Sequence, residues 1–331
     1  MPSLADFLPQ ATTSVVRRVI DGALEASVVG SFTKLGPAVR RRLWSWDSIA
    51  TDDLVGTTVV VTGANSGLGY ATAENLARRG AQVLIVGRSR SRSERAVESL
   101  AALVGSDRFS VFEADLGDLD AVRRVGAEIS EQHGRLRGLI HNAGALSAQR
   151  NESPQGHEMS LASMVLGPQL LTHCLIEALD ADEGRCIWVT SGGMYTQALH
   201  LDDLEMVNDY QGSVAYARAK RAQVDVVAEW ARRHRGATSF HATHPGWAAT
   251  PGVTESLPTF DRVLGPALRS PSEGSDTTTW LVGAPEGSTT TGLLWFDRRP
   301  RSVGRLPNTR SSPEDQARLW NSVESMIESQ L

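Results

Sequence analysis

"VTGANSGLGY", residues 61–70, is the stretch that decides the fold. Its glycine-rich turn follows a β-branched run at 57–63 and leads into a helical pattern at 70–80. Glycines at such a turn let the backbone bend tightly and approach a phosphate, while the helix N-terminus offers free N–H groups. Because the stretch lacks the GK[ST] ending of a triphosphate-binding loop, it predicts a dinucleotide site.

Short apolar runs alternate with helical patterns from Gly56 to the end of the chain. The predicted strands are 57–63, 81–87, 108–115, 136–144, 185–191, 239–246 and 291–297, and the predicted helices are 70–80, 93–105, 120–134, 170–179, 215–234 and 311–330. This alternation predicts an α/β fold in residues 54–331: a single Rossmann-like, doubly wound parallel sheet with helices on both faces. Residues 1–53 are predicted to form a helical extension.

Composition limits the class of protein. The chain has 331 residues, 41% of them hydrophobic, which is enough for one large domain, and a net charge of −5 that argues against nucleic-acid binding. Its two cysteines, Cys174 and Cys186, match no metal or redox spacing and predict buried thiols in a reducing compartment. Since the sequence shows no signal-peptide pattern and no apolar run of roughly 20 residues, we expect a cytoplasmic protein.

The N-terminal extension allows two interpretations. Val15, Val16, Val19 and Ile20 recur at helical spacing, and a basic, tryptophan-containing run follows at 40–46. Basic residues beside tryptophans can mark a contact of residues 1–50 with a membrane surface, which would make the protein peripheral to a membrane. Alternatively, the extension packs on the main domain or on a second subunit.

The end of the second predicted strand discriminates between dinucleotides. An NAD site usually carries an acidic residue there, which binds the ribose 2′-hydroxyl. Here Gly87 takes that place and is followed by Arg88 and Ser89. Because a guanidinium can pair with a 2′-phosphate, the sequence predicts NADP(H) as the cofactor.

Tyr216 and Lys220 are the first candidate catalytic pair. Of the four tyrosines, only Tyr216 has a lysine four residues on, which places both side chains on one helix face. An ammonium about 4 Å from the phenol would lower its pKa by up to roughly three, before burial opposes the effect. The pair would then exchange a proton near neutral pH.

Further signals fall at the carboxyl ends of the next predicted strands. HNAG at 141–144 ends the fourth, Thr190 and Ser191 end the fifth, and HPGWAAT at 244–250 ends the sixth. Ligands bind along this edge of a parallel sheet. A hydroxyl of Thr190 or Ser191 could there polarise a substrate oxygen.

With these motifs, residues 54–300 resemble the short-chain dehydrogenase/reductase family, and in particular its branch with the retinol dehydrogenases. The resemblance rests on TGANSGLG, ADL at 114–116, HNAG, TSGGM, YARAK and HPGWAATPGV. It implies that Tyr216 protonates the carbonyl oxygen, Ser191 hydrogen-bonds it, and Lys220 holds the nicotinamide ribose. The predicted cofactor-binding residues are Gly63, Asn65, Ser66, Gly67, Leu68, Gly69, Arg88, Ser89, Asp115, Leu116, Asn142, Ala143, Gly144, Tyr216, Lys220, Pro245, Gly246, Trp247 and Thr250.

One position departs from the family pattern. Met164 stands where the family commonly has an asparagine that helps to hold a proton-relay water, and a thioether cannot donate a hydrogen bond. Two functions therefore stay open: an active reductase or dehydrogenase, or a cofactor-binding protein of the same fold with weak or no catalysis that acts as a sensor or assembly partner.

The remaining expectations concern substrate, metal and assembly. The segment 247–275 is rich in apolar residues and predicts a cover over a lipophilic carbonyl or alcohol, although the same residues could simply pack a helix pair. His241 and His244 lack acidic or cysteine partners, so no metal site is predicted, and TSGGM lacks the first glycine of a hydrolase elbow. The family resemblance implies a homo-oligomer formed through the fourth and fifth helices of the domain.

Overall fold

The computed structural model describes residues 10–46, 53–105, 108–250, 262, 264–306 and 309–331. Its strands are β1 (Thr58–Thr62), β2 (Gln82–Gly87), β3 (Phe109–Glu113), β4 (Gly138–His141), β5 (Arg185–Val189), β6 (Ser239–Thr243), β7 (Leu293–Phe296) and β8 (Arg299–Arg301). They form one sheet in the order β3-β2-β1-β4-β5-β6-β7-β8, in which only β8 is antiparallel. The doubly wound α/β fold is thereby confirmed, and β8 is an addition that the sequence pattern did not reveal.

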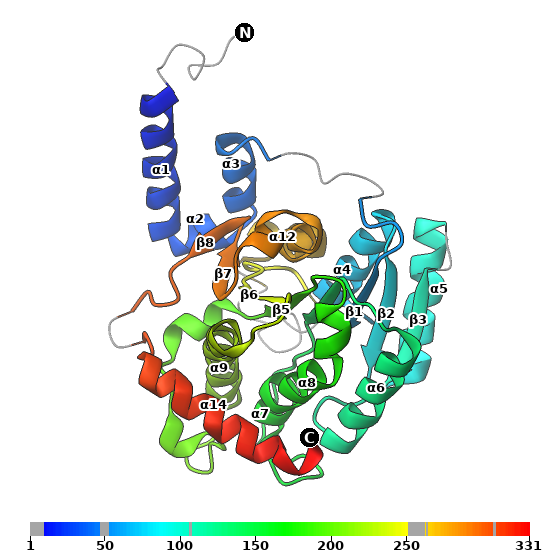
Figure 1. Cartoon of the computed structure of the whole chain (residues 1–331). Coiled ribbons are helices and arrows are strands. Elements are labelled where there is room, and N and C mark those ends of the chain that lie inside the picture. Colours follow the sequence, from blue (N-terminus) through cyan, green and yellow to red (C-terminus); the bar gives the residue numbers. More distant parts are fainter. Residues whose placement is uncertain (1–9, 47–52, 106–107, 251–261, 263, 307–308) are drawn as a thin grey trace.

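Helices cover both faces of the sheet (Figure 1). They are α4 (Gly67–Arg78), α5 (Arg90–Val104), α6 (Leu119–Gln132), α7 (Met159–Leu161), α8 (Gly167–Asp180), α9 (Gly212–Arg233), α12 (Pro271–Gly283), α13 (Glu286–Thr289) and α14 (Pro313–Ile327). Alternate residues of a strand point to opposite faces, and β1 shows this: Val60 packs with the α6, α8 and α9 core, whereas Val59 and Val61 pack with α4 and α12. The sheet therefore lies between two layers of buried hydrophobic side chains, one on each face.

A π-helical turn, η2 (Ala162–Leu166), joins α7 to α8. Together the helical residues 159–180 are long and apolar enough to span a membrane, but most of their apolar window is buried against the sheet. Such single turns of wide helix occur frequently at functional sites. Met164 lies inside this one and is fully buried.

The C-terminal helix α14 lies across α9 and reaches α8 (Figure 1). Trp320 of α14 packs edge-on against Trp230 of α9, with ring centroids 5.1 Å apart. Glu324 accepts from His173 of α8 at 3.0 Å, and Gln316 donates to Asp225 of α9 at 2.6 Å. The chain itself thus covers the outer face of its fourth and fifth domain helices.

The N-terminal extension forms α1 (Gln10–Ala26), α2 (Val28–Phe32) and α3 (Leu35–Leu43), which stand beside the β7–β8 end of the sheet in Figure 1. Arg40 of α3 is fully buried and pairs with Asp21 at 2.7 Å, Glu25 at 2.6 Å and Asp297 at 2.6 Å. Asp297 also pairs with Arg269 at 2.6 Å. The extension is therefore held on the main domain by a buried ion-pair cluster, which agrees with the packing interpretation.

Candidate functional site

The glycine loop between β1 and α4 is clamped to the end of β4. Asn142 donates its side-chain amide to the carbonyls of Thr62 at 3.0 Å and Gly63 at 3.3 Å. The Thr62 hydroxyl accepts the backbone N–H groups of Asn142 at 3.0 Å and Ala143 at 3.1 Å. Asn142, predicted to line the cofactor, therefore has its amide group engaged in holding two strand ends in register.

Close backbone contacts explain the glycines of this loop. Gly63 has φ +68°, and a Cβ atom there would lie 2.9 Å from Cα of Ala143. A Cβ atom on Gly69 would lie 2.4 Å from Nδ2 of Asn142. Gly67, with φ +57°, opens α4. Glycine at 63 and 69 is therefore required first by the protein's own packing.

The N-terminus of α4 is suited to an anion. The Ser66 side chain makes no cap hydrogen bond, so it leaves the first amides of the helix available. Asn65 and Leu68 are partly buried beside this N-terminus. Leu68 also lies near the loop that follows β6, because a Cβ atom on Gly274 would contact both Leu68 and Ala248 of that loop. The loop and the exit of β6 thus border one region.

The end of β2 carries the predicted phosphate-binding arginine. Arg88 is exposed and makes no ion pair within the described residues, while Glu113 at the end of β3 lies 3.8 Å from Arg90 instead. Ser89 occupies the N-cap position of α5, but its side chain makes no capping hydrogen bond. A Cβ atom on Gly87 would lie 2.6 Å from Oγ of Ser93, so a side chain at the place of the usual acid would require the Ser93 hydroxyl to move.

Asp115 and Leu116 follow β3 and lie differently from each other. Asp115 is exposed and accepts from N–H of Gly117 at 2.9 Å, which leaves its second carboxylate oxygen for a ligand. Leu116 is 5% exposed and belongs to the hydrophobic core. Asp115 therefore stays the better candidate for a contact with a bound base.

Ser191, Tyr216 and Lys220 lie together beyond the end of β5. The Ser191 side chain lies beside the Tyr216 hydroxyl, where it opposes the effect of burial on the tyrosine pKa, and its hydroxyl accepts from N–H of Gly193 at 3.3 Å. Lys220 follows Tyr216 by one helical turn, with Nζ 5.6 Å from the tyrosine ring centroid and 2.8 Å from the carbonyl of Val189, to which it donates. Thr190, the other candidate hydroxyl, donates instead to the carbonyl of Lys220 at 2.7 Å.

Burial governs the titration of this pair. It raises the pKa of Tyr216, opposed by the hydrogen bond from Ser191, and it lowers the pKa of Lys220 to about 7. The expected lowering of the tyrosine pKa by Lys220 is therefore not found here. The physical reason is that the phenol and the amine both lose water, and each loss favours the neutral form.

Met164 borders the same pair. A Cβ atom on Gly144 would lie 2.9 Å from Sδ of Met164 and 3.3 Å from Nζ of Lys220. The carbonyl of Met164 accepts from the side chain of Gln223 at 2.8 Å. The thioether thus fills space beside the lysine that a polar side chain would otherwise share.

The loop that follows β6 carries the other predicted cofactor residues, Pro245, Gly246, Trp247 and Thr250. His244 directly precedes them. Gly246, after Pro245, has φ +74° and donates to Nδ1 of His244 at 2.7 Å. Burial lowers the pKa of His244 to about 3, so the ring is neutral, and its Nε2 makes no hydrogen bond within the described residues. Of the predicted substrate cover, 251–261 and 263 lie outside the described residues.

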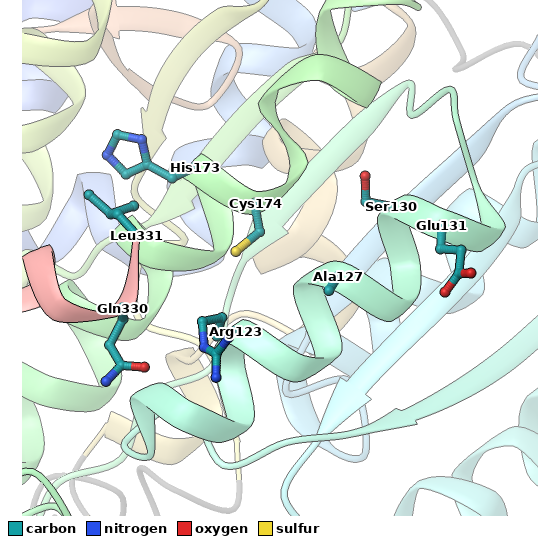
Figure 2. Close-up of a pocket in the computed structure, with 8 residues that line it drawn as sticks. All are labelled: Arg123, Ala127, Ser130, Glu131, His173, Cys174, Gln330 and Leu331. Carbon is teal, nitrogen blue, oxygen red and sulfur yellow. The ribbon is translucent and has the colours of Figure 1, made fainter.

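A hollow of the described structure lies elsewhere. Figure 2 shows it on the outer side of α6 and α8, next to the chain end, with a volume of about 560 Å³. Its lining residues are Arg123, Ala127, Ser130, Glu131, His173, Cys174, Gln330 and Leu331. None of the predicted site residues lines it, and burial raises the pKa of Cys174. This hollow therefore has no part in the candidate site.

The burial of Lys220 predicts a pH-dependent stability. Between about pH 7 and 10.5 the unfolded chain holds a proton that the folded chain lacks, so folding becomes more favourable as pH rises. We expect the free energy of unfolding, measured in urea, to rise with pH over this window by on the order of a few kcal/mol more in the wild type than in Lys220→Met. Lys34→Met is the control, because Lys34 is the only other lysine and is exposed. If the free energy of unfolding changed equally with pH in the wild type and in Lys220→Met, the lowered pKa of Lys220 would be contradicted.

Comparison with known proteins agrees with this geometry. The short chain dehydrogenase family model matches residues 57–259. The chain is 37% identical to Dehydrogenase/reductase SDR family member 12 of Bos taurus, over 82% of this chain and 86% of that one. It is 31% identical to Retinol dehydrogenase 14 of Homo sapiens, over 96% and 98%.

Solved structures share the fold. An uncharacterized protein from Mycobacterium paratuberculosis superposes with a TM-score of 0.67 and 26% identity, covering 83% of this chain and 94% of that one. A short-chain dehydrogenase from Escherichia coli CFT073, solved in complex with NADPH, gives 0.63 at 22% identity, over 76% and 100%. By its sequence, its sheet order and these relatives, the chain belongs to the short-chain dehydrogenase/reductase family of oxidoreductases.

Proposed function

We propose that the protein is an NADP(H)-dependent oxidoreductase that acts on a lipophilic carbonyl or alcohol, with Tyr216 as the acid/base. The placement of the Ser191 side chain beside the Tyr216 phenol, with Lys220 one helical turn further on and its Nζ 5.6 Å from the tyrosine ring centroid, carries this proposal. A bound nicotinamide would supply or accept the hydride. The residues of the chain bind the substrate oxygen and move its proton.

The titration of Tyr216 supports its role as an acid. Because burial raises its pKa, the phenol is protonated at neutral pH and can donate to a carbonyl oxygen. Ser191 can donate a second hydrogen bond to the same oxygen, which stabilises the negative charge that develops there. Lys220, held by the Val189 carbonyl, lies where it can replenish the proton or bind a ribose hydroxyl.

NADP(H) is the cofactor that the charge pattern favours. The α4 N-terminus is open to the pyrophosphate, and Arg88 is an exposed guanidinium without an ion pair among the described residues. Gly87 stands where an NAD site carries its acidic residue, so no carboxylate is present at this point. A 2′-phosphate would therefore meet a positive charge and no repulsion at this point.

The substrate is proposed to be lipophilic. Leu264, Pro266 and Leu268 follow the exit loop of β6, at the far end of the predicted cover. Retinol dehydrogenases 11, 12 and 14 are among the relatives, and their names state an apolar alcohol. Apolar residues around a few polar groups are the usual lining of a site for such a molecule.

Pairing of two copies through α8 and α9 is not part of this proposal. Trp320, Glu324 and Gln316 of α14 already occupy partners on both helices. An assembly of copies would have to displace this helix or use another face. We therefore propose that the implied homo-oligomer, if it forms, does so elsewhere.

The extension supports a peripheral membrane contact. In α1, Asp21 and Glu25 turn inward to Arg40, Arg301 and Arg305. The opposite face is exposed and consists largely of Val15, Val16, Val19 and Ile20. A helix on a protein surface normally faces the other way. The outward apolar face, with Arg18, Arg41 and Arg42 exposed on α1 and α3, fits a membrane surface that contains anionic lipid.

Tyr216→Phe tests the proposed chemistry. We expect NADPH-dependent reduction of an aldehyde and ketone panel, followed at 340 nm, to fall by on the order of 10² to 10⁴, because the proton donor is lost. NADPH affinity, measured by fluorescence titration, should stay within about threefold. Tyr210→Phe is the matched control, since its hydroxyl donates to the Ser147 carbonyl and the Glu158 carboxylate and not to a residue of the proposed catalytic group. Tight NADPH binding without turnover in the wild type would favour the weakly catalytic alternative that Met164 suggests.

Arg88→Ala tests cofactor choice. Removal of one guanidinium from a phosphate should weaken NADPH binding by about 10- to 100-fold and leave NADH binding nearly unchanged. Arg95→Ala, which removes the same charge from the exposed side of α5, should change neither. Equal affinities of wild type and Arg88→Ala for NADPH would overturn the assignment.

Val19→Asp tests the membrane contact. Vesicle co-sedimentation with phosphatidylcholine, with and without phosphatidylserine, should show binding that falls about tenfold in this variant, since a buried valine contributes about 1.5 kcal/mol. Val207→Asp is the control, because both valines are 66% exposed. Equal sedimentation of wild type and Val19→Asp would contradict the membrane contact. A molar mass that rises with protein concentration in light scattering would instead indicate that the apolar face of α1 binds a second copy of the chain.

A further inference from the structure

The last residues of α2 reach the candidate active site. The Phe32 ring is 3% exposed and packs against four other rings of the main domain. Its centroid lies 4.5 Å from His244, 5.4 Å from Phe296, 5.5 Å from Trp247 and 6.4 Å from Tyr195. Two of these partners, His244 and Trp247, flank the Pro-Gly turn that follows β6. A residue of the N-terminal extension is thus built into the wall of the site.

Backbone hydrogen bonds tie the same residues to both ends of the predicted substrate cover. The carbonyl of Phe32 accepts from N–H of Trp247 at 2.8 Å and from Nε of Arg269 at 3.0 Å. Lys34 donates its backbone N–H to the carbonyl of Ala267 at 3.0 Å and its Nζ to that of Pro266 at 2.6 Å. Residues 32–34 therefore hold the chain where the cover begins and where it ends.

Arg269 connects the loop that follows β6 to Asp297 and to the N-terminal extension. Its backbone N–H donates to Trp247 and its carbonyl accepts from Ala249, both at 2.8 Å. Its guanidinium reaches the carbonyl of Ser31 at 2.7 Å and Asp297 at 2.6 Å. It also fills the space over Gly246, where a Cβ atom would lie 2.3 Å from Nε. Arg269, the Pro-Gly turn and the extension consequently pack against one another.

Phe32 also touches the loop that carries Ser191. A Cβ atom on Gly192 would lie 2.9 Å from Nε2 of His244 and 3.0 Å from Cε2 of Phe32. Gly192 is the residue next to Ser191, and Gly193 donates to the serine hydroxyl. Any shift of the Phe32 ring would therefore be transmitted to the backbone that orients Ser191.

We propose that Phe32 is a positioning residue of the active site, which fixes the Ser191 loop, the Pro-Gly turn after β6 and Arg269 from outside the Rossmann domain. This inference rests on the proposed reductase function. A displacement of about 1 Å at a reacting group can cost on the order of a hundredfold in rate. Within the described residues, the glycine loop and Arg88 are not among the contacts of Phe32, so the proposed contacts to the cofactor phosphates do not depend on it.

The test compares Phe32→Ala and Phe32→Leu with Val29→Ala, which changes an exposed residue of the same short helix. With nonanal as the lipophilic probe and propanal as the small one, we expect Phe32→Ala to lower kcat by about 10- to 100-fold for both and to raise KM for nonanal only. Phe32→Leu should recover part of kcat, and NADPH affinity should stay within about threefold throughout.

Hydrogen exchange separates this inference from the proposed function. Peptides covering 190–196 and 245–249 should exchange faster in Phe32→Ala than in Val29→Ala, whether or not the wild type reduces either aldehyde. Should Phe32→Ala not fold, Phe32→Leu decides by the same two measurements. Equal kcat, KM and exchange in the Phe32 and Val29 variants would overturn the proposal. A wild type without turnover, but with the expected exchange difference, would refute the proposed function alone.

Discussion

The buried carboxylate of Asp297 is the contact on which the N-terminal half of the architecture depends. It is 2% exposed, and its two oxygens accept from Arg40 and Arg269, which are themselves buried. Asp297 also adopts φ +51°, a conformation that disfavours side chains other than glycine. Desolvated charges are tolerated only with full pairing, so α3, the β7–β8 turn and the segment before α12 have to meet in one arrangement.

Two properties follow from that arrangement. With Arg40 buried, Asp21 and Glu25 of α1 must turn inward to neighbouring cations, and the valines on the other side of the helix are left in solvent. With Arg269 fixed by Asp297, the carbonyl of Phe32 is fixed as well. One ion-pair cluster thus sets both the outward apolar face and the wall of the active site, although these lie at different ends of the extension.

The strands of the Rossmann sheet could be predicted because each is a short apolar run between turn residues, and the candidate site was placed where the runs end. Periodicity shows that α1 has two faces, but it cannot show which one faces the protein; the usual rule fails here because the partner surface is charged. The three-residue β8 is too short to leave a pattern. The contacts of Phe32 and Asn142 could not be predicted, because they are tertiary contacts that no local sequence pattern encodes.

The environment of Tyr216 and Lys220 bears on the direction of catalysis. A phenol whose pKa is raised is an available acid at neutral pH, whereas alcohol oxidation needs the phenolate, which this burial disfavours. The amine of Lys220, with its pKa lowered to about 7, carries only part of a positive charge there and does little to offset the effect. In the proposed function, Tyr216 is therefore protonated at neutral pH and available to donate to a carbonyl oxygen.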